Sequence, residues 1–465
     1  MKSAWSVLAA LTALGLVTIP VSACGSEEPQ STFDAGGNGD DAGDDGPPVL
    51  DFDSGTDAKP CVGLECQRVT CEGGGKTTLT GTVRDPSGTV PLYNALVYIP
   101  NAPVEPFPNG VTCDRCGTVP SGRPIATALT DAKGEFILEN VPVGADIPLV
   151  VQIGRWRRQV KIPSVARCAE TKVDADSARL PRNKLEGDIP RIAVTTGNAD
   201  SLECFVKKLG IDAGEITNPA GTGRINIFQG NGSRIDGTTP AATTLWNDET
   251  SLKKYDIVVL SCEGDEHNET KSAAAKANME KYLDAGGRVF ASHFHYTWFK
   301  NGPASLASTA AWVGNGNAGD QSVDIDQSFA KGVAFADWLV NVGASTTKGK
   351  VAMTELRRNV TSVPGAGAPV DRSRRWIYTP NGGVDDTKFY SFNAPIAKPA
   401  AEQCGRGVYT DIHVSSGDDS TGTFPGNCST TGFTPQEKAL LFLLFDLASC
   451  VQNENDPPVP PPVVK

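Results

Sequence analysis

The chain of 465 residues holds only four histidines, and each of them follows a segment that is predicted to form a strand. Acidic and aromatic side chains stand beside these histidines. The candidate ligands of one shared site are Glu263, Glu266, His267, His293, His295, Trp298, Asp411 and His413. Imidazole nitrogens and carboxylate oxygens together suit zinc or a similar divalent metal.

Three interpretations of these residues stay open. A bound metal would make the site a metal-assisted hydrolase, with Glu263 or Glu266 as the base. A pocket without a metal would bind a polar ligand, with Trp298 as one wall. In the third interpretation the histidines are structural and hydrogen-bonded within the core. The sequence requires no cofactor and identifies no catalytic residue, and zinc or a similar divalent metal is the one cofactor it suggests.

The spacing of His293 and His295 leaves a further alternative open. An extended backbone would project both imidazoles into the site, whereas a turn between them would separate the pair. Cys262 also follows a predicted strand. Its thiol is a candidate nucleophile, although the sequence places no base beside it.

The histidines must be positioned by strands and helices that alternate along the chain. Continuous apolar runs, the pattern of strands buried on both faces, lie at 190–196, 255–261 and 288–291. Residues 270–285 form a predicted helix, and Thr434 opens the last helix with a capping box. This order predicts a doubly wound α/β domain over 188–452. Ligands of such a sheet bind at the carboxyl ends of its strands, so the histidines should converge there.

Part of this domain resembles a known family. The segments Tyr255 to Leu260, Met279 to Leu283 and Gly286 to His293 are similar to the glutamine-amidotransferase-like, flavodoxin-like fold. In amidotransferases the strand after Gly-Gly ends in an elbow that presents a nucleophilic cysteine, and here that position is His293. The resemblance, which is to the trehalose-utilisation branch, therefore implies a ligand-binding domain that is not a Cys-dependent glutamine amidotransferase.

Residues 61–185 show a different pattern. Short runs rich in Thr, Val and Ile, separated by turns, lie at 79–83, 95–99, 125–130, 135–140 and 149–153. Such spacing predicts a β-sandwich. The motifs Gly81 to Gly88, Pro91 to Val97 and Thr130 to Phe136 resemble the carboxypeptidase regulatory-like β-sandwich, which is immunoglobulin-like and transthyretin-like. That family carries no catalytic residues, so the resemblance implies a spacer or a recognition module.

The segment 154–161 of this domain places four cations around Trp156. On a strand, Arg155 and Arg157 would share one face, while Trp156 and Arg158 share the other. The cations and the indole could accept an anionic polymer or a sugar. The alternative is a solvated edge strand whose charges discourage aggregation.

Twelve cysteines indicate an oxidising compartment. Six of them lie in or near the sandwich and are expected to form three structural disulfides rather than a metal site: Cys61, Cys66, Cys71, Cys113, Cys116 and Cys168. Cys404 and Cys428 flank a loop rich in Gly, Ser and Thr and are a candidate fourth bridge. If Cys24 is lipidated, eleven cysteines remain and one must be unpaired.

The amino terminus predicts export. Lys2 and the apolar stretch from Val7 to Ile19 are typical of a signal peptide, which would span 1–23. The sequence before Cys24 resembles a bacterial lipobox, and Gly25 in place of Asp implies release to the outer membrane, on its periplasmic or cell-surface face. Residues 24–60 hold ten acidic side chains and one lysine, which predicts a lipidated, disordered tether. Residues 453–465 predict an extended Pro-rich tail.

Charge and composition narrow the function classes. The net charge of −12 argues against a nucleic-acid partner, although most of it belongs to the tether. An apolar content of 39% with 21% charged residues excludes a polytopic membrane protein. The leading hypothesis is a lipid-anchored envelope protein that binds a ligand, with an envelope glycan or peptide as candidate partner. The alternatives are a metal-dependent hydrolase acting on extracellular glycan or peptide, and a structural or adhesion protein without a ligand pocket.

Overall fold

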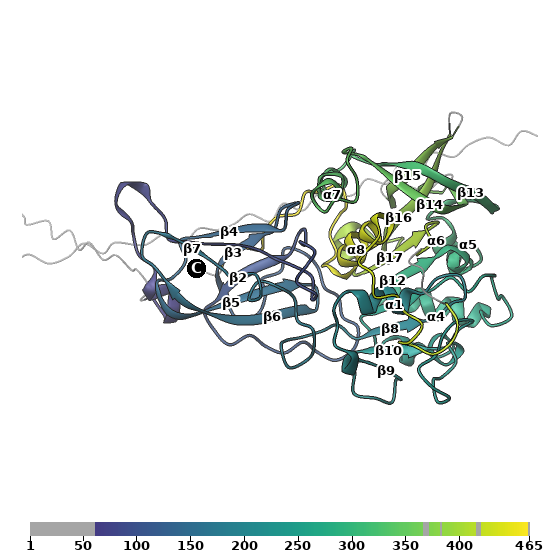
Figure 1. Cartoon of the computed structure of the whole chain (residues 1–465), viewed down its shortest axis with the longest axis horizontal. Helices are drawn as coiled ribbons and strands as arrows, with labels where there is room; N and C mark the ends of the chain where they lie inside the picture. The colour runs from purple at the N-terminus through teal and green to yellow at the C-terminus, as the bar shows by residue number, and fades with distance from the viewer. Residues whose placement is uncertain (1–60, 366–371, 382–383, 415–419, 464–465) are drawn as a thin grey trace, which may run out of the picture. The chain divides into compact units, whose positions relative to one another are not determined.

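The computed structural model describes residues 61–365, 372–381, 384–414 and 420–463, and residues 60–465 form one compact unit (Figure 1). Within the described ranges, no helix is both long and apolar enough to cross a membrane. The predicted signal peptide (1–23), the Cys24 lipidation site and the predicted tether (24–60) lie outside the described residues. These three assignments stay predictions.

The first folded part consists of two β-sheets with the strand orders β4-β1-β7 and β3-β2-β5-β6 (Figure 1). Their strands are β1 (Thr78–Thr82), β2 (Leu96–Pro100), β3 (Pro124–Leu129), β4 (Glu135–Glu139), β5 (Gly144–Ile153), β6 (Trp156–Val165) and β7 (Glu170–Lys172). Val97, Leu138 and Val151 come from three of these strands and have no exposed surface. Both sheets therefore contribute to one buried apolar cluster.

All five strands predicted in this part are confirmed to within a few residues, except that β5 begins earlier than expected. The turn before β4 has a local cause, because the Asp131 carboxylate accepts the backbone N–H groups of Lys133 at 2.8 Å and Glu135 at 2.9 Å. Gly134 has a φ of +73°, which only glycine adopts without strain. The assignment to the carboxypeptidase regulatory-like family stays a prediction.

The second part is built on a ten-stranded sheet with the order β14-β13-β15-β16-β17-β12-β11-β8-β10-β9. Its strands are β8 (Ile192–Thr195), β9 (Ile216–Thr217), β10 (Ile225–Phe228), β11 (Ile257–Leu260), β12 (Arg288–Ser292), β13 (Ala311–Ile325), β14 (Lys350–Ser362), β15 (Ser373–Asn381), β16 (Val384–Ala394) and β17 (Gly405–Thr410). The helices are α1 (Leu202–Lys208), α2 (Thr243–Trp246), α3 (Glu249–Leu252), α4 (Ala273–Asp284), α5 (Thr297–Lys300), α6 (Ala304–Ala307), α7 (Ala330–Asn341) and α8 (Pro435–Ala448).

The six strands from β17 to β9 are parallel to one another. Every residue of β8, β11 and β12 is buried, as the continuous apolar runs predicted. The predicted capping box is also confirmed: the Thr434 hydroxyl accepts the backbone N–H of Glu437, and the Glu437 carboxylate accepts that of Thr434. These local signals placed the strands and helices that surround the candidate site.

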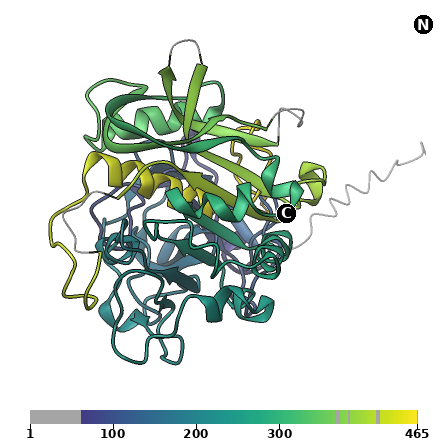
Figure 2. The same ribbon diagram turned by 90° about the vertical axis from the view of Figure 1, so that its right-hand side faces the viewer.

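The sequence did not predict the antiparallel strands β13 to β16, which extend the sheet beyond β17. Figure 2 shows these green strands at one end of the sheet and the teal parallel strands at the other. β13 carries many glycine and polar residues and pairs with β14 through several register shifts, so it lacks a regular apolar alternation. The flavodoxin-like assignment of the whole second part stays a prediction.

The two parts share apolar contacts and covalent links. Tyr93 of the first part stacks on Phe442 of α8 with ring centroids 5.5 Å apart, and the Trp338 indole N–H donates to the Pro91 carbonyl at 2.7 Å. The insertion at 103–122 carries Cys113 and Cys116, which the second part binds covalently. The five disulfides of the described residues are Cys61–Cys66, Cys71–Cys168, Cys113–Cys404, Cys116–Cys450 and Cys204–Cys428.

The prediction that the six sandwich cysteines pair among themselves is therefore wrong for Cys113 and Cys116, and the Cys404–Cys428 bridge is also wrong. Spacing along the chain favoured near neighbours, whereas the fold brings together cysteines that are 291 and 334 residues apart. Cys262 is the free cysteine among the described residues, which agrees with the expected unpaired thiol.

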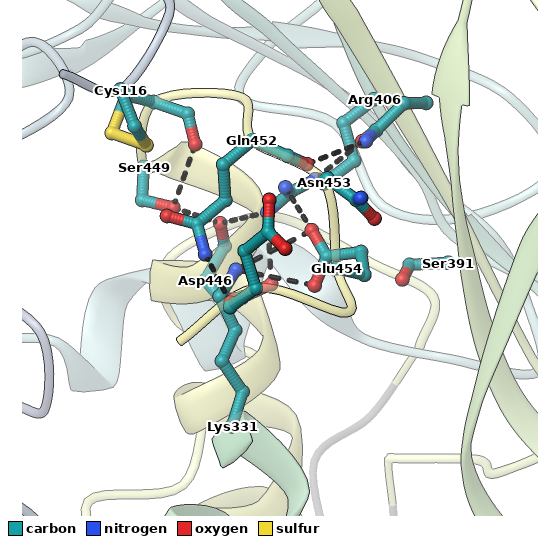
Figure 3. Close-up of polar contacts among 12 residues, drawn as sticks. Cys116, Lys331, Ser391, Arg406, Asp446, Ser449, Gln452, Asn453 and Glu454 are labelled. Atoms are coloured by element: carbon teal, nitrogen blue, oxygen red, sulfur yellow. Dashed lines mark hydrogen bonds and ion pairs between the residues drawn. A yellow bond between two sulfur atoms is a disulfide. The ribbon is translucent and has the colours of Figure 1, made fainter. Parts of the chain in front are cut away.

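A buried ion-pair network lies where α7, α8, β17 and the end of the chain meet (Figure 3). Arg406 of β17 contacts Asp446 at 3.0 Å and also pairs with Glu454. Lys331 of α7 contacts Asp446 at 2.9 Å and Glu454 at 3.2 Å. Two cations thus face two carboxylates. The segment 453–465, predicted as an extended tail, therefore begins inside the folded unit.

The Cys113–Cys404 disulfide is expected to stabilise the compact unit. Replacing both cysteines by serine should lower the free energy of unfolding by about 2–5 kcal/mol, because the bond restricts a long loop of the unfolded chain. The matched control is the Cys61→Ser/Cys66→Ser variant, whose bond spans a sequence separation of 5 and should contribute less. Chemical denaturation measures both losses, and equal losses would contradict a larger stabilisation by the Cys113–Cys404 disulfide.

Candidate functional site

The candidate site lies at the carboxyl ends of four adjacent strands, β17, β12, β11 and β8. Asp200 follows β8, Cys262 follows β11, His293 directly follows β12, and His413 follows β17. Parallel strands end at the same edge of a sheet, which brings these residues together although they are far apart in sequence. The predicted convergence is confirmed for His293 and His413.

Cys262, His293 and His413 form a compact group, named here the Cys–His–His cluster. One ligand atom from each residue lies within 4.8 Å of the others, and the Cys262 Sγ is 3.4 Å from the His293 Nδ1. The two imidazole rings are 4.8 Å apart between centroids. All three side chains are buried, with at most 3% of their surface exposed.

Asp200 fixes the orientation of His413. Its carboxylate contacts the His413 Nδ1 at 2.9 Å, accepts the Val414 backbone N–H at 2.8 Å, and also accepts the Ser292 hydroxyl. The His413 Nε2 is buried and has no hydrogen-bond partner among the described residues. In metal sites, a histidine ligand commonly binds a carboxylate through one ring nitrogen and the metal through the other. The His413 Nδ1 has the carboxylate, and its Nε2 is free among the described residues.

His293 occupies the elbow after β12. Its φ of +31° lies in the left-handed region, which non-glycine residues rarely adopt and which often marks functional sites. The elbow turns the chain into a short 3-10 helix, His293–Tyr296, so His293 and His295 point to different surroundings. The His293 Nε2 is 3.1 Å from the Asn315 Oδ1 of β13.

Two members of the cluster, Cys262 and His293, are uncharged at neutral pH, whereas the Asp200 carboxylate favours the charged form of His413. Burial, aided by the nearby His413, lowers the pKa of His293 to about 3, and burial raises the pKa of the Cys262 thiol. Burial alone would lower the pKa of His413, but attraction to Asp200 outweighs it and raises that pKa above the ordinary value. A neutral thiol therefore faces a neutral His293.

His295 and Trp298 are structural. The His295 Nε2 contacts the Ser261 carbonyl at 2.7 Å, and its Nδ1 accepts the Trp298 indole N–H at 2.9 Å. Both ring nitrogens are thus used. Trp298 has no exposed surface and meets Trp246 edge to face, with ring centroids 5.1 Å apart. The structure therefore does not bring these two side chains into a pocket.

Glu263, Glu266 and His267 also contact residues outside the Cys–His–His cluster. Glu263 pairs with the buried Lys271 at 2.5 Å, and Glu266 accepts the Tyr296 hydroxyl. His267 is partly exposed and contacts Glu269 at 3.0 Å. Because these groups are engaged outside the Cys–His–His cluster, the hydrolase hypothesis lacks the base that the sequence suggested.

Asp411 supports the site without contacting the cluster in any hydrogen bond. Its carboxylate accepts the Tyr409 hydroxyl at 2.7 Å and the Asn359 backbone N–H at 2.8 Å, which ties β14 to the end of β17. Burial raises the pKa of Asp411 to about 6. Its main role is therefore to hold the segment that carries His413.

Sequence reasoning missed Asp200 and Asn315, and it considered Cys262 only as a nucleophile. The position of Cys262 after a buried strand, together with the odd cysteine count, was a usable signal. Asn315 offered none, because it lies on β13 in the unexpected antiparallel extension.

Comparisons with known proteins place this chain in no family. No protein-family model and no curated protein sequence matches it. Two interface mutants of a type II cohesin–X-dockerin complex from Acetivibrio cellulolyticus are similar at 14% and 16% identity, each with a TM-score of 0.16. These matches cover 30% and 27% of this chain and 75% and 79% of the other. A 9R-lipoxygenase from Cyanothece PCC8801 is similar at 12% identity over 75% of this chain and 45% of its own, with a TM-score of 0.12. Scores this low support neither a fold nor a function.

The Glu263–Lys271 pair provides a test of the structural assignment. Lys271→Met should lower the free energy of unfolding by about 3–5 kcal/mol, because it leaves a buried carboxylate without its cation. The control is Lys253→Met, which breaks a partly exposed pair with Glu249 and should change stability by about 1 kcal/mol or less. Thermal or chemical unfolding gives both values. A Lys271→Met loss as small as the control would show that Glu263 is free for another role.

Proposed function

We propose that this protein is an exported, lipid-anchored metalloprotein whose second part holds zinc or a similar divalent metal on Cys262, His293 and His413. One observation carries the proposal: three ligand atoms lie within 4.8 Å of one another. All three residues are buried, and Cys262 forms no disulfide. The orientation of His413 by Asp200 supports it.

The ligand set favours zinc. A thiolate and two imidazoles are ligands that zinc prefers, and three protein ligands leave one tetrahedral position for water or a bound molecule. A metal ion would also remove the penalty on the Cys262 thiolate, because the cation replaces the lost hydration and the thiol proton is released. The His413 Nε2 would then gain the partner that it lacks among the described residues.

A second candidate function has its own observation. Cys262, His293 and Asn315 are linked in the order of a Cys–His–Asn hydrolase, with contacts of 3.4 Å and 3.1 Å. Against this candidate, burial favours the protonated thiol, whereas the nucleophile must be a thiolate. It also assigns no role to His413.

The wider assignments are part of the same proposal. Five disulfides suit an oxidising compartment, which supports export. An envelope glycan or peptide is the proposed partner, the membrane is reached through the lipid on Cys24, and nucleic acid is not a partner. The structural or adhesion alternative would leave the buried His413 Nε2 without a partner among the described residues, whereas buried polar groups normally have one.

Elemental analysis of the purified full chain tests the metal site. The chain should contain about one zinc per molecule after equilibration with zinc, because three buried ligands converge, and Cys262→Ser or His413→Ala should abolish it. His267→Ala should retain the metal, since that residue lies outside the cluster. A chain that binds no metal, and whose Cys262 is alkylated while folded, would contradict the proposal and favour the hydrolase candidate.

Membrane fractionation tests the anchor. Cys24→Ser should move the protein from the membrane fraction to the soluble fraction, because the variant cannot carry the acyl chains that give stable attachment. Cys262→Ser, which removes another free thiol, is the matched control and should remain with the membrane. Continued membrane partition of the Cys24→Ser protein would rule out a lipid anchor at this position.

A further inference from the structure

A second feature lies at the opposite edge of the large sheet, where the parallel strands begin. A cleft of about 810 Å³ opens there. Arg191 directly precedes β8 and Arg224 directly precedes β10. The cations that line the cleft are Arg155, Lys184, Arg191, Arg224, Lys253 and Lys254.

The acidic residues of the cleft do not neutralise these cations. Asp256 is paired with Arg155 at 2.7 Å, and Asp188 is paired at 2.7 Å with Arg157, which lies outside the cleft lining. Lys253 is paired with Glu249. Among the described residues, no carboxylate lies within ion-pair distance of Lys184, Arg191, Arg224 or Lys254.

Three of these four cations, Arg191, Arg224 and Lys254, lie just before neighbouring strands of the sheet. β8 and β10 are neighbouring strands with Ile192 opposite Ile225, so Arg191 and Arg224 directly precede two strands whose backbones lie about 4.8 Å apart. Lys254 precedes β11, on the other side of β8. Several cations in a row are better suited to bind a polymer that carries several negative charges than a single small anion.

Two walls of the cleft come from the first part of the molecule. The insertion at 103–122 contributes Phe107, and the turn between β5 and β6 contributes Arg155. Arg155 and Arg157 both lie over the Phe107 ring, at 5.8 Å and 4.0 Å from its centroid. They share one face, as predicted, while Trp156 is buried.

We propose that this cleft binds an acidic polysaccharide through its row of unpaired cations. Charge complementarity and the length of the row support an extended polyanion. The Arg157 guanidinium already lies over the Phe107 ring, where it competes with the stacking of a nucleic-acid base. The proposal goes beyond the metal site and does not depend on it, because the two sites lie at opposite edges of the sheet.

Binding of polygalacturonate to the purified full chain, measured over a series of salt concentrations, tests the proposal. Lys184→Gln/Lys254→Gln should weaken binding by about tenfold at low salt and reduce the slope of log affinity against log salt by about two, since two cationic contacts are lost. Both lysines are exposed, so the variant should fold. The matched control is Lys161→Gln/Lys172→Gln, which removes the same charge from exposed positions outside the cleft and should change neither quantity.

Several outcomes would overturn the proposal. One is the absence of salt-sensitive binding, and another is equal weakening in the control variant. A single-stranded oligonucleotide of equal charge that binds more tightly than polygalacturonate would identify nucleic acid as the better partner. Displacement of polygalacturonate by an equal concentration of inorganic phosphate would identify a single-anion site. His413→Ala should leave polygalacturonate binding intact, which separates this test from that of the metal site.

Discussion

The buried charge of Arg406 is the constraint on which the rest of the second part depends. Arg406 has no exposed surface, and its partners Asp446 and Glu454 come from α8 and from the chain beyond it. Burial alone would raise the pKa of Asp446, but attraction to Lys331 and Arg406 outweighs it and lowers that pKa. A buried pair that loses one member costs about 3–5 kcal/mol, so the network fixes these segments relative to one another. β17 is among them, and β17 leads directly to His413.

The sequence predicted the elements whose causes are local. β8 and β11 are buried along their whole length and almost entirely apolar. Thr434 caps α8 because its side chain and that of Glu437 satisfy each other's backbone N–H groups. Local pattern also placed His413 after a strand, while the resemblance to the amidotransferase-like fold placed His293 at an elbow. Convergence of these two residues follows from parallel strands alone, without any knowledge of side-chain contacts.

What the sequence could not predict depends on distant partners. Asp200 orients His413 across 213 residues, and the ion pair of Glu263 with Lys271 removes a carboxylate that looked like a base. Cys262 and Glu263 are neighbours in sequence, yet only Cys262 joins the cluster, because successive side chains at the end of an extended strand point in different directions. No composition or spacing rule identifies which of the two faces the histidines.

The two edges of the sheet also explain why the first part is more than a spacer. At the carboxyl edge, the Cys–His–His cluster is built entirely from the second part, and its three side chains are buried. At the opposite edge, cations remain unpaired among the described residues, and the insertion at 103–122 supplies one wall. That insertion also carries both cysteines that link the two parts. The two disulfides that link the first part to the second therefore also fix the insertion beside the strand starts. The shape of the cleft depends on this covalent link.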